Sequence, residues 1–333
     1  MNQAADTQPP ILKLENVSKK FVLKQPILDR LRGKPLRSVH AVDDVSFSIQ
    51  QGENLGLVGE SGCGKSTLAR TISRLYKPDQ GRILFDNKDL ASLSGIELRE
   101  ERKRLQMIFQ DPYSSLNPRM SVRDMLTESL RVHDICDKKN MEAHMAGLLE
   151  QVGMSINIAD RFPGEFSGGQ RQRLGIARAL SVSPTFIIAD EPVSALDVSI
   201  QAQIINLLGE LQESLGLTIL FISHDLRVVQ HITHRVAVMY LGKIIELSPT
   251  AELFQQQYHP YAKVLIQAAP VLDPRQRNQD TVIDGEPPSP IILPSGCRFH
   301  PRCKYVQDKC KVELPEMTQV IPGRWVACHY PLL

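Results

Sequence analysis

The chain has 333 residues, of which 42% are hydrophobic and 23% charged. This length is enough for about two domains, each with a buried core. The 39 basic and 37 acidic residues leave a formal net charge of only +2, which argues against a dedicated nucleic-acid binder, so no nucleic-acid partner is expected.

Three features bear on a membrane location. Residues 1–10 lack a basic segment followed by an apolar run, so a secretory signal is not expected. The longest apolar stretches, residues 217–222 and 235–242, are much shorter than the ~20 residues of a membrane-spanning helix. Residues 22–40 carry five basic side chains and one acid, which we interpret as a solvated loop, with contact to lipid head groups or a membrane subunit as the alternative.

A phosphate-binding loop is predicted near the start of the chain. The apolar run Leu55–Val58 is followed by a glycine-rich stretch and then by Leu68, Ile72 and Leu75 at helical spacing, an order typical of strand, loop and helix. The stretch Gly59–Ser66 fits GxxxxGK[ST]. Inward-turned backbone N–H groups and the positive end of the helix dipole would hold the phosphates of ATP. A flexible glycine turn is the alternative, but it leaves the lysine unexplained.

Each residue of this loop has an expected role. Lys65 reaches the β- and γ-phosphates, Ser66 gives its hydroxyl to Mg²⁺, and Thr67 contacts the α-phosphate. Cys63 is expected to be there because it is small, with a thiol pKa lowered by the helix N-terminus. The predicted nucleotide-binding residues are Gly59, Ser61, Gly62, Cys63, Gly64, Lys65, Ser66 and Thr67.

The next stretches divide the chain into an α/β core and a helical insertion. Residues 11–110 and 166–250 alternate between strand and helix patterns, whereas 111–165 has helical apolar spacing and no strand alternation. We therefore expect a nucleotide-binding domain over 1–250, with a helical subdomain at about 111–165. A C-terminal extension over 251–333 follows it.

A second helix start is predicted at Ser167. Ser167, Gly168 and Gly169 precede a helix that carries Leu174, Ala177 and Leu180, so backbone donors are exposed there as a second anion site. The phosphate loop lies far away in the sequence and has its own helix. The two anion sites need not meet within one chain.

A pair of carboxylates follows a buried strand. The apolar residues 186–189 lead into Asp190 and Glu191, which places both acids at the carboxyl end of a parallel strand. Asp190 is suited to the Mg²⁺ shell, and Glu191 to polarising the attacking water as general base. The alternative is that the two acids merely end a strand. The next helix is expected between an Asp197 N-cap and a Gly216 C-cap.

Six motifs in order closely resemble the ATP-binding subunits of ABC transporters: Gly59–Ser66, Gln110 in "MIFQDP", "FSGGQ", "FIIADEP", "SALD" and His224 in "FISHD". One departure is Phe166, where leucine is commoner in the family. The resemblance implies an α/β P-loop NTPase core of the ABC ATPase type, with a RecA-like sheet, an antiparallel β subdomain and a helical subdomain.

The resemblance also implies a head-to-tail dimer. ATP would be held between the phosphate loop of one subunit and the SGGQ segment of the other, which brings in Ser167, Gly168, Gly169 and Gln170. Gln110 would sense the γ-phosphate, join the Mg²⁺ shell with Ser66 and Asp190, and couple to the membrane partner, while His224 contacts the γ-phosphate and Asp197 communicates across the dimer. Phe21 looks like the aromatic residue that stacks on adenine, with a core aromatic as the alternative.

The C-terminal part resembles a narrower group. The stretch "HPYAKVLIQAAPVLDP" (259–274) and the proline-rich stretch 285–296 are similar to the extension of dipeptide and oligopeptide importer ATPases. This implies an ATPase subunit on the cytoplasmic face of the inner membrane, with a paralogous second ATPase in a heterodimer, two permease subunits and a periplasmic or extracellular substrate-binding protein. Nickel chelates or glutathione are alternative cargoes.

Four cysteines close to the end of the chain suggest a metal site. The intervals between Cys297, Cys303, Cys310 and Cys328 are five, six and seventeen residues, which does not match paired zinc knuckles. Four thiolates satisfy an iron–sulfur cluster chemically, and similar tails of some peptide-importer ATPases bind a 4Fe–4S cluster. Zinc, with His300 or His329 as a substitute ligand, and free thiols remain alternatives. A bound cluster would first be structural, since the segment is too small to own a core.

Two other functions compete with an importer subunit. A soluble ABC protein acting on ribosomes or DNA would usually show two cassettes or a long coiled coil, and neither pattern is present in the sequence. A soluble, redox-regulated ABC ATPase would instead have an activity that follows the state of the cysteines.

Overall fold

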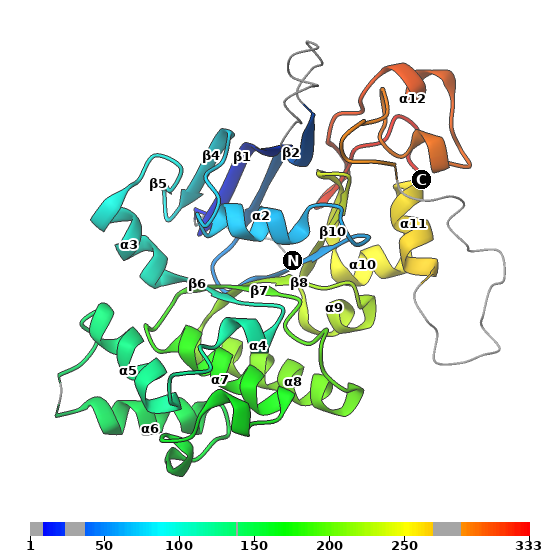
Figure 1. The fold of residues 1–333 in the computed structure, drawn as a ribbon. Helices are drawn as coiled ribbons and strands as arrows, with labels where there is room; N and C mark the ends of the chain where they lie inside the picture. Colours follow the sequence, from blue (N-terminus) through cyan, green and yellow to red (C-terminus); the bar gives the residue numbers. More distant parts are fainter. Residues whose placement is uncertain (1–8, 24–36, 138, 269–287) are drawn as a thin grey trace, which may run out of the picture. The chain divides into compact units, whose positions relative to one another are not determined.

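The computed structural model describes residues 9–23, 37–137, 139–268 and 288–333 (Figure 1). The chain forms two compact units. The first contains Met1–Ile49, Leu55–Ala91 and His224–Leu333, and the second contains Gln50–Asn54 and Ser92–Ser223. Most of the basic stretch 22–40 and the first residues of the proline-rich stretch 285–296 lie outside the described residues.

The first unit contains an antiparallel sheet of four strands. Its order is β2-β1-β4-β5, with Leu12 of β1 opposite both Ile49 of β2 and Phe85 of β4. Burial alternates over Leu12–Glu15 of β1, because successive side chains point to opposite faces, and the alternation breaks near Val17, where the register shifts. The strands are β1 (Leu12–Val22), β2 (Ser38–Ile49), β4 (Gln80–Phe85) and β5 (Lys88–Asp89). This sheet is the expected antiparallel β subdomain.

A second set of strands in the first unit leads to the phosphate loop. The strands run in the order β11-β12-β10-β9-β3, with β3 parallel to β9 and the other neighbours antiparallel. Helix α9 packs closely on β3, because a Cβ at Gly56 would lie 2.8 Å from Val229 Cγ1. The elements are β3 (Asn54–Val58), α2 (Lys65–Ile72), α9 (Leu226–Ile232), β9 (Arg235–Tyr240), β10 (Lys243–Pro249), α10 (Thr250–Gln255), α11 (Pro260–Gln267), η4 (His300–Arg302), α12 (Asp308–Val312), β11 (Thr318–Ile321) and β12 (Arg324–Val326).

The second unit contains three parallel strands in the order β8-β7-β6, and every residue of β7 and β8 is buried. Helices fill the stretch 111–165, which has no strand among its described residues, as its apolar spacing predicts. The elements are α3 (Gly95–Arg104), β6 (Leu105–Ile108), α4 (Pro112–Ser115), α5 (Val122–Val132), α6 (Met141–Gln151), η1 (Ile156–Ile158), η2 (Pro163–Glu165), α7 (Gly168–Leu180), β7 (Phe186–Asp190), α8 (Val198–Leu215) and β8 (Thr218–Ile222).

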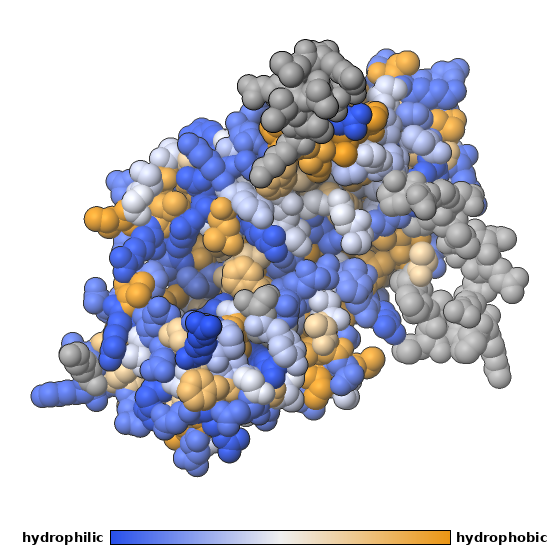
Figure 2. Space-filling view, viewed as in Figure 1, coloured by the Kyte–Doolittle hydropathy of each residue, from blue (hydrophilic) through white to orange (hydrophobic). Residues whose placement is uncertain are grey.

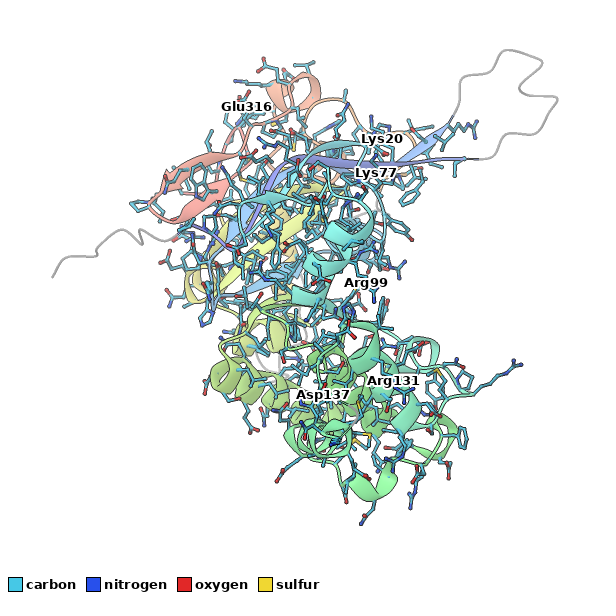
Figure 3. All side chains as sticks on the ribbon, turned by 90° about the vertical axis from the view of Figure 1, so that its left-hand side faces the viewer. Lys20, Lys77, Arg99, Arg131, Asp137 and Glu316 are labelled. Carbon is cyan, nitrogen blue, oxygen red and sulfur yellow. The ribbon has the colours of Figure 1, made fainter. Side chains whose placement is uncertain are left out.

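The residues predicted to cap the helix between Asp197 and Gly216 are those that bound it in the structure. Helix α8 begins after Asp197 and ends at Gly216, whose φ of +63° is the left-handed value that glycine adopts readily. Arg99 of α3 donates a hydrogen bond to the carbonyl of Val132 at the end of α5, the helix that contains Arg131, and Figure 3 labels both arginines.

The exposed face drawn in Figure 2 is mainly hydrophilic, with separate hydrophobic patches. Over the described ranges, none of the helices has both the length and the apolar character needed to cross a bilayer.

Candidate nucleotide site and cysteine cavity

Glycine is required at two positions of the phosphate loop. The loop between β3 and α2 has φ values of +153° at Gly59, +78° at Gly62 and +113° at Gly64. A Cβ at Gly59 would lie 2.2 Å from the Met239 carbonyl oxygen, and one at Gly64 would lie 2.0 Å from that of Ala41. Both distances are far below van der Waals contact, so the tight loop that the sequence predicts depends on these glycines.

Lys65 closes over the loop from the first turn of α2. Its side chain is only 5% exposed, and Nζ donates to the carbonyl oxygens of Gly59 at 2.8 Å and Glu60 at 3.0 Å. Gly64 is the N-cap of α2, so the first helical N–H groups follow the loop directly. Ser66 and Thr67 are half-buried on the same turn. Lysine, loop and helix end therefore provide a positive environment that suits a phosphate.

Cys63 differs from its expected chemistry. The thiol is buried, and this burial raises its pKa, although the nearby Lys65 charge acts in the opposite direction. The predicted lowering of this pKa is wrong, because loss of water outweighs the lysine charge and the helix N-terminus. Cys63 is thus a small packing residue rather than a reactive thiol.

Phe21 forms an aromatic pair in the first unit. Its ring lies 5.2 Å from that of Tyr76 in an edge-to-face arrangement, and Lys19 Nζ lies 5.5 Å from the Phe21 centroid. Phe21 is half-buried and does not belong to the buried core. Figure 3 shows Lys20 and Lys77, the sequence neighbours of the two rings, close together. A partly open aromatic face can stack on a base.

In the second unit, Gln110 and Glu191 come together. β6 and β7 are parallel neighbours, so the residues after their carboxyl ends lie at one edge. Gln110 Nε2 donates to Glu191 Oε2 at 3.0 Å, and the Glu191 N–H donates to the Ile222 carbonyl at 2.9 Å. Asp190, the last residue of β7, is 0% exposed. One of the two predicted carboxylates, Glu191, is thus hydrogen-bonded to Gln110, which is itself a predicted site residue.

The SGGQ segment begins α7 as expected. Ser167 is the N-cap, its Oγ accepts from the Gln170 N–H at 3.3 Å, and Gln170 Oε1 accepts from the Ser167 N–H at 3.0 Å. This reciprocal pair is a capping box. Two other predicted residues, Asp197 of the second unit and His224 of the first, are exposed.

Four thiols and three histidines line one cavity in the first unit. All six cysteines are free. The cavity is lined by His259, Pro260, Cys297, Phe299, His300, Cys303, Tyr305, Cys310, Cys328, His329 and Tyr330. Cys297, Cys303, Cys310 and Cys328, the four predicted metal ligands, therefore line one cavity.

Backbone N–H groups point toward three of these sulfurs. Cys297, Cys303 and Cys328 each accept a hydrogen bond from the N–H two residues later, at Phe299, Tyr305 and Tyr330. Burial nevertheless raises the pKa of the Cys297 and Cys303 thiols, and raises the pKa of Cys328 to about 12. The bare thiols are therefore protonated near neutral pH, while the N–H donors would stabilise the charged form.

His259 offers a buried donor to the same cavity. Its Nδ1 accepts from the Tyr261 N–H at 3.0 Å, which places the proton of the neutral ring on Nε2. Nε2 has no hydrogen-bond partner anywhere in the described chain. Burial lowers the pKa of His259 to about 3. The sequence predicts no role for His259, although this residue begins the quoted "HPY" stretch.

The expected metal geometry is not found. Within residues 9–23, 37–137, 139–268 and 288–333, no group of three or more His, Cys, Asp or Glu side chains is arranged to hold a metal ion. The thiols line one cavity, but their positions are not those of a preformed ligand set. The four cysteines predicted to bind a 4Fe–4S cluster thus lie around one cavity, but they are not arranged in the geometry that would coordinate a metal.

Comparison with known proteins decides the family. Residues 42–194 match the ABC transporter family, and residues 245–310 match the C-terminal region of oligopeptide/dipeptide transporters. The probable peptide ABC transporter ATP-binding protein y4tS of Sinorhizobium fredii is 52% identical, over 96% of this chain and 89% of its own length. The chain belongs to the ABC transporter ATP-binding proteins.

Two further ABC proteins support this assignment. The oligopeptide transport ATP-binding protein AppF of Bacillus subtilis is 50% identical over 98% of both chains. A dimeric structure of the ATP-binding cassette MJ0796 bound to ADP and Pi has a TM-score of 0.62 and 27% identity, and the match covers 72% of this chain and 98% of that one. The predicted fold class is confirmed, and the chain is an ABC ATPase that uses ATP and Mg²⁺.

Proposed function

We propose that this chain is the ATP-hydrolysing subunit of a bacterial importer for dipeptides and oligopeptides, working peripherally on the cytoplasmic face of the inner membrane. The observation that carries the proposal is that one chain combines an ABC cassette with the C-terminal region of oligopeptide/dipeptide transporters. The name of AppF, a relative of nearly equal extent, supports a peptide cargo. Nickel chelates and glutathione remain alternative cargoes.

The proposed catalytic roles follow the local geometry. Lys65 and the loop hold the phosphates, and Phe21 stacks on adenine. Gln110 orients the Glu191 carboxylate, which then accepts a proton from the attacking water. Ser66, Gln110 and Asp190 would hold Mg²⁺, which neutralises charge on the phosphates when it is bound. His224 contacts the γ-phosphate.

We further propose a head-to-tail dimer. Ser167, Gly168, Gly169 and Gln170 begin a helix whose first N–H groups suit a phosphate, and Asp197 is exposed nearby in the same unit. The structure of the ATP-binding cassette MJ0796 bound to ADP and Pi is dimeric, which supports the formation of a dimer. The partner would be a paralogous ATPase, joined by two permeases and a periplasmic or extracellular substrate-binding protein. The nucleotide-binding domain would span 1–250, with a helical subdomain at about 111–165, and the extension 251–333.

For the cysteine cavity we propose a sulfur-ligated metal group, with a 4Fe–4S cluster as the first choice and zinc as the alternative. Cys297, Cys303, Cys310 and Cys328 supply the soft ligands that both groups accept. The N–H donors to three sulfurs and the unpartnered Nε2 of His259, in the part of the chain described, suit an electron-rich sulfur group. When bound, the group would link distant points of the C-terminal chain.

The replacement Glu191→Gln tests the proposed function. It should leave ATP binding intact, because the amide keeps the shape of the side chain, but lower ATP turnover by about 10²-fold or more. Peptide uptake by cells that carry only this variant should be lost, while the assembled transporter still copurifies. ATP binding, ATPase rate, uptake and copurification are the four measurements.

Glu213→Gln, an exposed glutamate on α8 of the same unit, is the matched control and should change none of them. Unchanged turnover in Glu191→Gln would remove this residue from the role of general base. Normal ATPase activity without peptide uptake, in a complex that takes up another solute, would overturn the proposed cargo.

A further inference from the structure

The segment from Cys297 to Cys303, "CRFHPRC", contains two cysteines and two arginines with different surroundings. Its cysteines line the cavity, while its two arginines contact the surroundings of the phosphate loop. Arg298 is buried and donates to the Leu241 carbonyl and to Asp43 Oδ2. We call residues 297–303 the cysteine segment. Its position between the cavity and the loop suggests that it links them.

Arg302 makes the direct contact. Its Nη1 lies 2.9 Å from Glu60 Oε2 and its Nη2 lies 3.0 Å from Glu60 Oε1, so the pair is bidentate. The two side chains are 5% and 19% exposed. Nη1 also donates to the Tyr240 hydroxyl at 3.3 Å. A bidentate, mostly buried ion pair fixes both position and orientation, which a single exposed contact does not.

Glu60 carries this contact into the ATP site. It is the second residue of the phosphate loop, and each of its polar groups is used. The carboxylate binds Arg302, the N–H donates to Tyr261 Oη at 2.8 Å, and the carbonyl accepts from Lys65 Nζ at 3.0 Å. Glu60 therefore joins the cysteine segment to the lysine expected to hold the phosphates.

An aromatic cluster supports both contacts to Glu60. Phe299 of the cysteine segment lies 5.4 Å from the ring of Tyr240 and 5.4 Å from that of Tyr261. Tyr240 contacts Arg302, and Tyr261 contacts the Glu60 N–H. A displaced cysteine segment would therefore disturb the phosphate loop through the ion pair and through the tyrosines.

We propose that Arg302 is a positioning residue of the ATP site, which fixes Glu60 and thereby Lys65, so that the order of the cysteine segment sets the affinity for ATP. The inference rests on ATP binding, and it depends neither on a peptide cargo nor on which metal the cysteines hold. It gives the C-terminal extension a function in the nucleotide cycle.

Equilibrium binding of MgATP to the full-length chain tests the proposal. Arg302→Ala should weaken ATP binding about tenfold, in line with the loss of charge-assisted hydrogen bonds. Arg302→Lys should recover only part of this loss, because an ammonium cannot replace the guanidinium fork. Because the phosphate loop is displaced before chemistry begins, KM should rise while kcat at saturating ATP stays within about twofold.

Glu60→Gln and the double variant decide whether the two residues act together. Glu60→Gln should weaken binding to a similar degree, and Glu60→Gln with Arg302→Ala should be no weaker than the worse single variant. Lys311→Gln is the control, since Lys311 is a cation of the same extension whose partner Asp308 is exposed. Additive losses, or wild-type affinity in a folded Arg302→Ala protein, would overturn the proposal.

Replacing cysteines tests the link to the cavity. The variant with Cys297→Ser and Cys303→Ser should weaken MgATP binding in the wild-type background but have little further effect when Arg302 is already alanine. An unchanged affinity in the wild-type background, or an equal loss in both backgrounds, would overturn the coupling. Circular dichroism of each variant separates these outcomes from general unfolding. Because no peptide or permease takes part, a wrong cargo would leave these results unaffected.

Discussion

Glu191 and His259 are both held in unusual states, the first in a left-handed backbone conformation and the second as a buried neutral ring. Glu191 has a φ of +47°, a left-handed value that costs a non-glycine residue about 1–3 kcal/mol. His259 is buried as a neutral ring although an imidazole usually titrates near pH 6.5. The Glu191 carboxylate accepts a hydrogen bond from Gln110, and the His259 ring lines the cysteine cavity.

The lowered pKa of His259 makes stability depend on pH. Because the folded pKa is about 3 and the ordinary value is 6.5, the neutral ring contributes stability that is complete above pH 6.5 and is lost as the pH falls from 6.5 toward 3. Between pH 7 and pH 5, the metal-free wild type should lose about 2 kcal/mol more unfolding free energy than His259→Gln. Urea unfolding at the two pH values measures this difference. Equal losses would mean that the pKa of His259 is the same in the folded and the unfolded chain.

At the scale of elements, the close packing of α7 against α8 explains why position 169 of the SGGQ segment is a glycine. A Cβ at Gly169 would lie 2.5 Å from Cγ2 of Ile200, so α7 approaches α8 too closely for a side chain there. Ile200 is β-branched and cannot easily rotate away. Gly175, on the same helix α7, has no atom within 4 Å of an added Cβ in the described structure. Packing therefore requires glycine at position 169 but not at position 175.

Alanine replacements at the two glycines should have opposite effects. Gly169→Ala forces a methyl group against Ile200 and should lower the free energy of unfolding by about 1–3 kcal/mol. Gly175→Ala should raise it by about 0.5–1 kcal/mol, because alanine favours a helix interior. Chemical denaturation of both variants in the absence of nucleotide provides the comparison. Equal effects would show that α7 and α8 have room to separate.

The elements that were predicted correctly depend on neighbouring residues. The strand–loop–helix around Lys65, the helix start at Ser167 and the Gly216 end of α8 are all encoded within a few positions of the sequence. The Glu60–Arg302 pair could not be predicted in this way, because 242 positions separate its partners. The Cys63 pKa was mispredicted for a related reason. The direction of this pKa shift depends on burial by distant segments, which a loop motif does not encode.

At the scale of the whole chain, the last part of the C-terminal extension, residues 288–333, depends on contacts outside itself. Among residues 288–333 the buried apolar side chains are Phe299, Cys310, Val326 and Ala327, too few for an independent core. β12 pairs with β10, and Arg324 forms a buried ion pair with Glu246 of β10 at 3.3 Å. A link among the four cysteines would fix the part of the extension that no strand holds.

The last prediction is therefore that metal binding stabilises the folded chain. Protein purified without oxygen should contain iron and inorganic sulfide, and removal of the metal should lower the unfolding temperature. A contribution of about 2 kcal/mol corresponds to roughly 4–8 °C for a unit of this size. Serine at all four cysteines should abolish metal binding and give the unfolding temperature of the stripped wild type, whereas Cys136→Ser, in the second unit, should change neither. Zinc without sulfide would select zinc as the bound metal, and a metal-free chain of unchanged stability would mean that the thiols are free.

Metal uptake should also release protons, because the bare thiols of Cys297, Cys303 and Cys328 have raised pKa values. Titration calorimetry in buffers of different ionisation enthalpy detects this release.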